Sequence, residues 1–231
     1  MSRKKRLWLP DHFYHVVSRG NRRDPLFQDD RDFRAFFYNM KELSEKSPFE
    51  ISSYCFMTNH YHLQIRSPEV QLSQIMSRLN KGYANYYNTR YNLCGHVFEK
   101  RFHAEPISNP YGNFVVSHYI HMNPVRANMV ESPEDYPWSS YRYFQSSKLK
   151  ASLKNIPFFT PKANLELFKG SRENYVTAFQ ALNDNRKVLD NPKNPNSRRK
   201  FYFTANIPYL ANQREGAISD MQMKIGNHIY F

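Results

Sequence analysis

Residues 49–66, which read FEISSYCFMTNHYHLQIR, decide the fold that we expect for this chain. Two runs rich in β-branched and aromatic residues, 49–57 and 60–66, flank the pair Thr58-Asn59, and this pattern predicts an antiparallel hairpin. Side chains alternate between the two faces of a strand. The polar residues of the second run therefore share one face: His60, His62, Gln64 and Arg66. The apolar residues between them face the core.

The segments around the hairpin predict a mixed α and β domain. The aspartate pair 29–30 can cap a helix that Pro48 ends. The pair Asn109-Pro110 starts another helix, which continues to about Met122. The other expected elements are strands at 13–18 and 101–107 and a helix at 72–91. This order is that of a ferredoxin-like α+β sandwich, with a central antiparallel β-sheet covered by helices.

The composition excludes several classes of protein. No run of 18 apolar residues is present, so no membrane-spanning helix is expected. Only seven glycines and no GxGxxG or GxxxxGK[ST] motif disfavour a glycine-rich nucleotide-binding loop. Cys55 and Cys94 are too few for a disulfide framework, and the basic start of the chain lacks the apolar stretch of a secretory signal. We therefore expect a cytoplasmic protein with reduced thiols.

The charge points to a partner. Lys and Arg number 33 against 20 Asp and Glu, a net charge of +13, and 16% of the residues are aromatic. This mixture suits a partner with phosphates and stackable bases, although a merely cationic soluble protein has the same composition. The charge is divided between a domain at 1–145, net +5, and a basic C-terminal extension at 146–231, net +8. Within the extension we expect a helix near 171–182 and a partly flexible tail.

The pair His60 and His62 could hold a divalent cation. Alternation places their imidazoles side by side, about 7 Å apart at the backbone. With nine histidines in the chain, such a pair also arises by chance, as two polar residues on a solvated face. The pair alone therefore leaves both interpretations open.

The end of the helix that starts at 109 adds two residues to this candidate site. Tyr119 and Asn123 stand four residues apart, on one helix face. An Asn carbonyl oxygen suits Mg²⁺ or Mn²⁺, and a phenol beside the cation could attack a phosphate. The alternatives are core packing for Tyr119 and a helix C-cap before Pro124 for Asn123.

At these residues the chain resembles a bacterial family, the REP-associated tyrosine transposases. This family is a branch of the insertion-sequence-200-like group, whose members are single-tyrosine HUH transposases. The resemblance extends from about residue 8 to 145. Five motifs carry it in order: SRGNR at 18–22, MTNHYHL at 57–63, GHVFEKR at 95–101, YIHMNPV at 119–125 and WSSY at 138–141.

The resemblance implies a catalytic domain at 1–145 that acts on single-stranded DNA beside REP-type hairpins, with Mg²⁺ or Mn²⁺. His60 and His62 match the HUH pair, Tyr119 the nucleophile, and Asn123 the residue that completes the metal site. The family forms a 5′-phosphotyrosine intermediate and frees a 3′-hydroxyl. Such a protein would be nucleoid-associated, as a monomer or a homodimer.

The sequence defines the general base for Tyr119 and the residues that contact DNA less sharply. His118, His121 and Gln64 are candidates for the group that deprotonates Tyr119, and His121 lies on roughly the opposite helix face. Ten polar residues could contact DNA, or be solvated surface or structural groups instead: Arg3, Lys4, Lys5, Arg6, Arg19, Asn21, Arg22, Arg23, Arg101 and Arg126.

Two other functions compete with a strand-transferase. A metal-dependent nuclease would hydrolyse the phosphodiester with water and leave Tyr119 structural. A non-catalytic, sequence-specific DNA-binding regulator would have no need of the set His60, His62, Tyr119 and Asn123. Trapping of a covalent protein–DNA adduct separates the first of these from the transferase.

Overall fold

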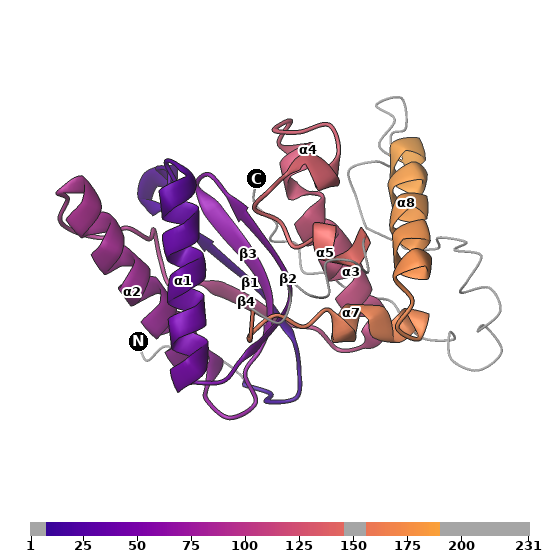
Figure 1. Ribbon diagram of the computed structural model, residues 1–231, viewed down its shortest axis with the longest axis horizontal. Coiled ribbons are helices and arrows are strands. Elements are labelled where there is room, and N and C mark those ends of the chain that lie inside the picture. The colour runs from indigo at the N-terminus through magenta and orange to yellow at the C-terminus, as the bar shows by residue number, and fades with distance from the viewer. Residues whose placement is uncertain (1–7, 146–155, 190–231) are drawn as a thin grey trace, which may run out of the picture. The chain divides into compact units, whose positions relative to one another are not determined.

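Four strands make one sheet in the computed structural model, which describes residues 8–145 and 156–189 of the chain (Figure 1). The strands are β1 (Tyr14–Arg19), β2 (Glu50–Met57), β3 (His60–Arg66) and β4 (His103–Pro106). Their order is β2-β3-β1-β4, and every pair of neighbours is antiparallel. The predicted ferredoxin-like α+β sandwich is confirmed.

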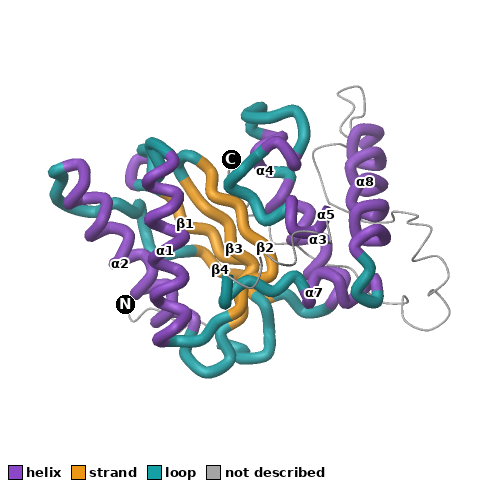
Figure 2. The backbone as a smooth tube through the Cα atoms, viewed as in Figure 1, coloured by secondary structure: helices purple, strands orange, loops and turns teal. Residues whose placement is uncertain are grey.

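Helices cover both faces of the sheet (Figure 2). α1 (Asp30–Lys46) and α2 (Leu72–Tyr91) pack against each other on one face, and α3 (Pro110–His121) contacts β2 and β3 on the other. The side chain of Asp29 caps α1 by accepting hydrogen bonds from the backbone N–H groups of Arg31 and Asp32, as its position before the helix predicts. The sheet thus separates two layers with different residues.

The layer between the sheet, α1 and α2 is an aromatic core. The buried ring of Phe36 lies with its centroid 5.2 Å from Phe56 of β2, 4.8 Å from Tyr61 of β3 and 5.1 Å from Tyr83 of α2. Burial of each ring of this kind contributes about 1.5–3 kcal/mol to the free energy of unfolding. This core fixes β2 and β3. On the opposite face β3 presents polar side chains, whereas Cys55 and Met57 of β2 pack against Ile120 of α3.

Two later segments cover the outer edge of β2. The Phe56 N–H donates to the Trp138 carbonyl at 3.0 Å, and the Ile51 N–H donates to the Phe158 carbonyl at 2.7 Å. The ring of Trp138 stacks on Phe33 of α1 at 4.6 Å. Pairing of this edge protects it from association with other chains.

The chain divides into two units, at Met1–Arg172 and Glu173–Phe231. Residues 156–172 therefore stand with the first unit, beyond the domain boundary at 145 that the sequence predicts. The described part of this unit also has shorter helices, namely η1 (Asn21–Arg23), α4 (Asn123–Arg126), η2 (Pro133–Asp135), α5 (Arg142–Gln145), α7 (Lys162–Leu165) and η4 (Glu166–Phe168).

The helix predicted near 171–182 lies within α8 (Arg172–Leu189), which continues into the second unit. The predicted partly flexible tail that follows this helix falls outside the described residues beyond Leu189. Over the described ranges, no helix has the length and hydrophobicity needed to cross a membrane.

Candidate active site

The register of β3 places the predicted histidine pair on the face that α3 covers. The rings of His60 and His62 are neighbours, with centroids 4.9 Å apart and planes at 79°. His62 is only 4% exposed, whereas His60 is half-buried at the end of the strand. The pair therefore lies at the rim of the layer between the sheet and α3.

α3 brings Tyr119 to this pair. The helix begins where the sequence predicts, because the Asn109 side-chain oxygen accepts from the Gly112 N–H at 2.7 Å and Pro110 occupies the first turn. Ten residues after Asn109, the half-buried Tyr119 ring meets the His62 ring edge-on, with centroids 5.7 Å apart. The structure thus brings His60, His62 and Tyr119 together.

A buried polar network holds α3 on the sheet. The Gln64 amide nitrogen donates to the Asn113 side-chain oxygen at 2.9 Å. The Ser53 hydroxyl donates to the Gln64 amide oxygen at 2.6 Å and lies 2.9 Å from the Ser117 hydroxyl. Because both ends of its amide are used, Gln64 is a structural residue in this geometry rather than a base for Tyr119.

His121 also has a structural environment. It is fully buried, its Nε2 lies 2.8 Å from the Ser140 hydroxyl, and its ring packs 5.2 Å from Phe144. Burial holds the pKa of His121 well below its ordinary value, with a smaller contribution from His118. A buried, hydrogen-bonded imidazole of this kind is a poor acceptor for the Tyr119 proton.

Two arginines influence the phenol of Tyr119. Burial raises the pKa of Tyr119, whereas the positive charges of Arg126 and Arg19 lower it. The guanidinium carbon of Arg126 lies 5.1 Å from the centroid of the Tyr119 ring, a cation–π distance. The sequence did not predict this role, since both arginines were expected to contact DNA.

The histidine pair is in the protonation state that a metal ligand needs. Burial, with help from Arg19, lowers the pKa of His60 to about 4, and burial lowers the pKa of His62 well below its ordinary value. Both rings are therefore neutral near pH 7. The Nε2 of His62 is buried without a hydrogen-bond partner. A cation would satisfy this nitrogen, so the residues fit a divalent metal.

Asn123 caps the end of α3 in this structure. Its side-chain nitrogen donates to the Tyr119 carbonyl at 2.8 Å and to the Ile120 carbonyl at 3.3 Å. These bonds use the amide nitrogen and leave the amide oxygen as the possible ligand. Within residues 8–145 and 156–189, no group of three or more His, Cys, Asp and Glu side chains could hold a metal, so a third ligand from these residues would be of another type.

His15 also lies at this site, although the sequence alone did not predict it there. Its Nε2 lies 3.1 Å from His62 Nδ1, the two rings stack with centroids 5.3 Å apart, and the Tyr119 ring lies 5.6 Å away. Alternation places His15 with Val17 on one face of β1, but only the pairing of β1 with β3 reveals which face. Burial, followed by the charge of His103, lowers the pKa of His15 to about 4.

The predicted DNA contacts are only partly near this site. Arg19 pairs with His60 across the strands, while Arg22 and Arg23 are exposed in the following turn with positive φ values of 53° and 66°. Gly20 begins this turn, because a Cβ there would lie 2.2 Å from the Asp24 carbonyl oxygen. The remaining candidates are Asn21 in the same turn, the exposed Arg101, and Arg3, Lys4, Lys5 and Arg6, which lie outside the described residues.

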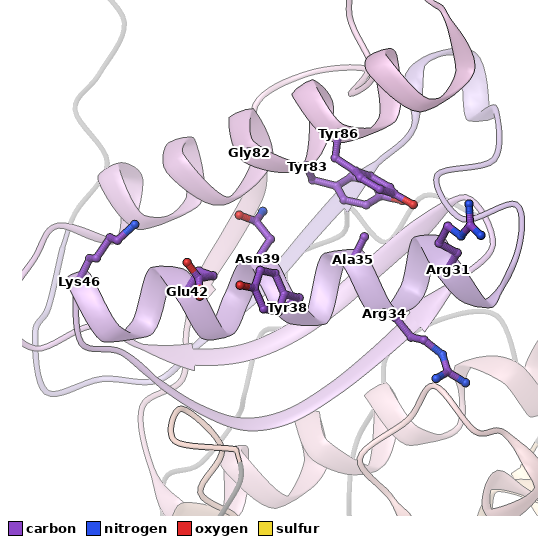
Figure 3. Close-up of a pocket in the computed structure, with 10 residues that line it drawn as sticks. All are labelled: Arg31, Arg34, Ala35, Tyr38, Asn39, Glu42, Lys46, Gly82, Tyr83 and Tyr86. Carbon is purple, nitrogen blue, oxygen red and sulfur yellow. The ribbon is translucent and has the colours of Figure 1, made fainter.

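A separate hollow of about 680 Å³ lies between α1 and α2 (Figure 3). Arg31, Tyr38 and Lys46 are among its lining residues, and it contains none of the predicted catalytic or metal-binding residues. Gly82 lets α2 approach α1 here, because a Cβ would lie 2.6 Å from the Asn39 side-chain oxygen. The candidate active site is thus on the opposite face of the sheet from this hollow.

Comparisons with known proteins agree on one family. The family model described as "Transposase IS200 like" matches residues 9–123. A Haemophilus influenzae protein named as a REP-associated tyrosine transposase is 23% identical over 142 residues, which are 56% of this chain and 78% of the relative. The solved structure of a REP-associated tyrosine transposase bound to a REP hairpin shares the fold, with a TM-score of 0.56 and 19% identity over 64% of this chain and 88% of that one.

The matched region holds His15, the histidine pair, Tyr119 and Asn123, whereas Arg126 lies just beyond it. It begins before β1, which carries His15, and ends at Asn123, so the histidine pair and Tyr119 all lie inside it. Residues 9–123 of the chain therefore belong to the IS200-like transposase family, a family of DNA-cleaving enzymes.

Proposed function

We propose that this chain is a metal-dependent nicking and joining enzyme for single-stranded DNA that cuts beside REP-type hairpins. The observation that carries the proposal is the convergence of the Tyr119 phenol and the neutral His60 and His62 rings on one face of the sheet. The hairpin bound to the related solved transposase supports the choice of substrate.

Tyr119 is the nucleophile of this reaction. Its phenol oxygen attacks the scissile phosphorus, a new O–P bond forms to the 5′ side, and the 3′-oxygen leaves as a hydroxyl after taking a proton. The resulting 5′-phosphotyrosine keeps the phosphodiester linkage. A second 3′-hydroxyl can therefore reverse the step and join a new strand without ATP, and Tyr119 recovers its proton.

Arg126 and Arg19 prepare the phenol for attack. Tyrosine titrates near pH 10 in water, and burial raises the pKa of Tyr119 further. The two guanidinium groups act in the opposite direction and favour the phenolate. Arg126, which lies against the ring, also stands where it can contact the charge of the incoming phosphate.

His60, His62 and the side-chain oxygen of Asn123 would hold the divalent cation, Mg²⁺ or Mn²⁺. When bound, such a cation polarises the scissile phosphate as a Lewis acid. The neutral imidazoles and the unpartnered Nε2 of His62 support this assignment. An amide oxygen suits these hard cations as the further ligand.

The DNA is held mainly through its phosphates. We assign this role to basic and polar residues around the first strand, namely Arg3, Lys4, Lys5, Arg6, Asn21, Arg22 and Arg23, together with Arg101. Dispersed Lys and Arg contacts of this type supply affinity that falls with salt. An enzyme with this substrate acts in the cytoplasm at the nucleoid.

A covalent trap tests the proposal. Labelled single-stranded DNA with a REP-type hairpin is incubated with the protein and Mg²⁺ or Mn²⁺, then denatured and separated on a gel. We expect a slow band of protein-linked DNA that is lost in Tyr119→Phe. Tyr111→Phe, a change in the same helix, is the matched control and should keep the band. Cleavage without any adduct would instead indicate a nuclease that uses water, and hairpin binding without cleavage would indicate a regulator.

A further inference from the structure

The two site histidines share a feature that the predicted ligand set does not explain. Each has its Nδ1 beside a polar atom of a neighbouring residue. His60 Nδ1 lies 2.7 Å from the side-chain oxygen of Asn59, and His62 Nδ1 lies 3.1 Å from Nε2 of His15. The same atom of both rings is thus hydrogen-bonded inside the protein.

For His60 this contact determines the position of the proton. An amide oxygen can only accept, so His60 must donate from Nδ1. The ring is neutral, and its Nε2 therefore keeps a lone pair. A lone pair on Nε2 is what a metal ligand requires.

For His62 one proton lies between two neutral rings, and two arrangements are possible. If His15 donates, His62 carries its own proton on Nε2, which is buried without a partner. A buried donor left unsatisfied is destabilising. If His62 donates from Nδ1 to His15, its Nε2 keeps a lone pair and can ligate a cation. The second arrangement matches that of His60.

We propose that His15 is a positioning residue of the metal site, which accepts a hydrogen bond from His62 and thereby presents the Nε2 lone pair of His62 to the cation. This inference rests on the proposed metal dependence. Partners that orient a ligating histidine in this way fix its tautomer and raise its basicity, and their loss weakens metal binding.

The surroundings of His15 suit this role. β1 is paired on both sides, with β3 and with β4, so the backbone of His15 is fixed. Its ring stacks on His62 with planes at 17°, and the Tyr119 ring meets it at 73°. His15 therefore has little freedom to turn away from His62.

Direct ligation by His15 is the competing role. Two nitrogens 3.1 Å apart could also share one ion. Among the residues of the described ranges, however, no set of three His, Cys, Asp or Glu side chains has the geometry of a metal site. The stacked arrangement of the two rings agrees with a hydrogen bond between them.

The first test reads the tautomer without any metal. Long-range ¹H–¹⁵N NMR of the metal-free full chain distinguishes a proton on Nδ1 of His62 from one on Nε2. We expect the Nδ1–H form in the wild type and in His15→Gln, whose amide oxygen can still accept. In His15→Phe the preference should be lost. A wild-type protein with the proton on Nε2 of His62 would overturn the proposal.

The second test measures Mn²⁺ affinity by calorimetry. We expect His15→Phe to weaken Mn²⁺ binding by about 10–100-fold, and His15→Gln to recover most of that loss. His12→Phe is the matched control, since His12 is a half-buried histidine that precedes β1 and lies outside the proposed metal site, and this variant should bind Mn²⁺ as the wild type does.

The two tests separate the inference from the proposed function. A wild type that binds no Mn²⁺ would refute the metal dependence itself. A wild type that binds Mn²⁺, with unchanged affinity in His15→Phe, would refute only the role of His15. Three imidazole nitrogens coupled to bound Mn²⁺ in spin-echo spectra, instead of two, would replace positioning by direct ligation.

Discussion

Replacing Asn123 by aspartate or by leucine separates the two things that its side chain can do. Both variants lose the amide nitrogen that donates to the Tyr119 and Ile120 carbonyls at 2.8 and 3.3 Å. Each such bond contributes about 1 kcal/mol, so we expect the free energy of unfolding to fall by about 2 kcal/mol in both. For the unit Met1–Arg172, a loss of about 2 kcal/mol lowers the melting temperature by about 4–8 °C.

The two variants differ in the oxygen that they offer to a cation. Aspartate keeps an oxygen donor, so Asn123→Asp should retain activity at similar metal concentrations. Leucine removes the donor, so Asn123→Leu should need at least about tenfold more Mg²⁺ for half-maximal cleavage, by analogy with other losses around metal sites. High Mn²⁺ should rescue it in part, because Mg²⁺ demands a more nearly ideal octahedron.

Single-turnover cleavage at increasing Mg²⁺ or Mn²⁺ gives the metal concentration for half-maximal cleavage. Melting curves of the same samples give the loss of stability. Asn88→Leu is the matched control, since the Asn88 side chain also donates to a carbonyl near a helix end, that of Gly95 at 3.1 Å, away from the site. It should leave the metal midpoint unchanged. Lowered melting temperatures with unchanged metal midpoints in Asn123→Leu would show that Asn123 is only a cap.

Three further predictions concern the rest of the site. His60→Ala and His62→Ala should each abolish cleavage but leave hairpin binding in a gel shift nearly intact, because affinity comes from dispersed phosphate contacts. An equal loss of cleavage and of hairpin binding would contradict this prediction. Arg126→Gln removes a charge that lowers the pKa of Tyr119, so the phenolate should form only at higher pH. The pH profile of the single-turnover cleavage rate, measured between about pH 6 and 9, should therefore move to higher pH, and an unshifted profile would remove Arg126 from this role. Asn164→Leu removes two buried hydrogen bonds from α7 to β2, of 3.0 and 2.9 Å. The melting temperature measured by circular dichroism should fall by about 4–8 °C, and an unchanged temperature would refute the idea that Asn164 anchors α7 on β2.

The parts of the fold that depend on local patterns could be predicted from the sequence. Alternation in residues 60–66 gave the correct face to His60 and His62, because side-chain direction in a strand depends only on position. The caps Asp29 and Asn109 act on the residues that follow them, so the starts of α1 and α3 were also predictable.

The features that depend on distant contacts were not predictable. His15 reaches His62 only through the register of β1 on β3, and no local pattern determines that register. Residues 156–172 have short helices and irregular backbone, so nothing in their pattern predicts that Phe158 pairs with Ile51 of β2. The position of Arg126 on the Tyr119 ring depends on how the chain continues after α3.

The covalent bond between Tyr119 and DNA is the centre of this account, and peptide mass spectrometry of the trapped adduct tests it most directly. Protein incubated with the hairpin substrate and Mn²⁺ is digested with protease and nuclease, and the peptide that carries a nucleotide is sequenced. We expect a nucleotide linked through its 5′-phosphate to Tyr119 of α3. Cleaved DNA with a free 5′ end and no modified peptide, or a nucleotide on another residue, would contradict it.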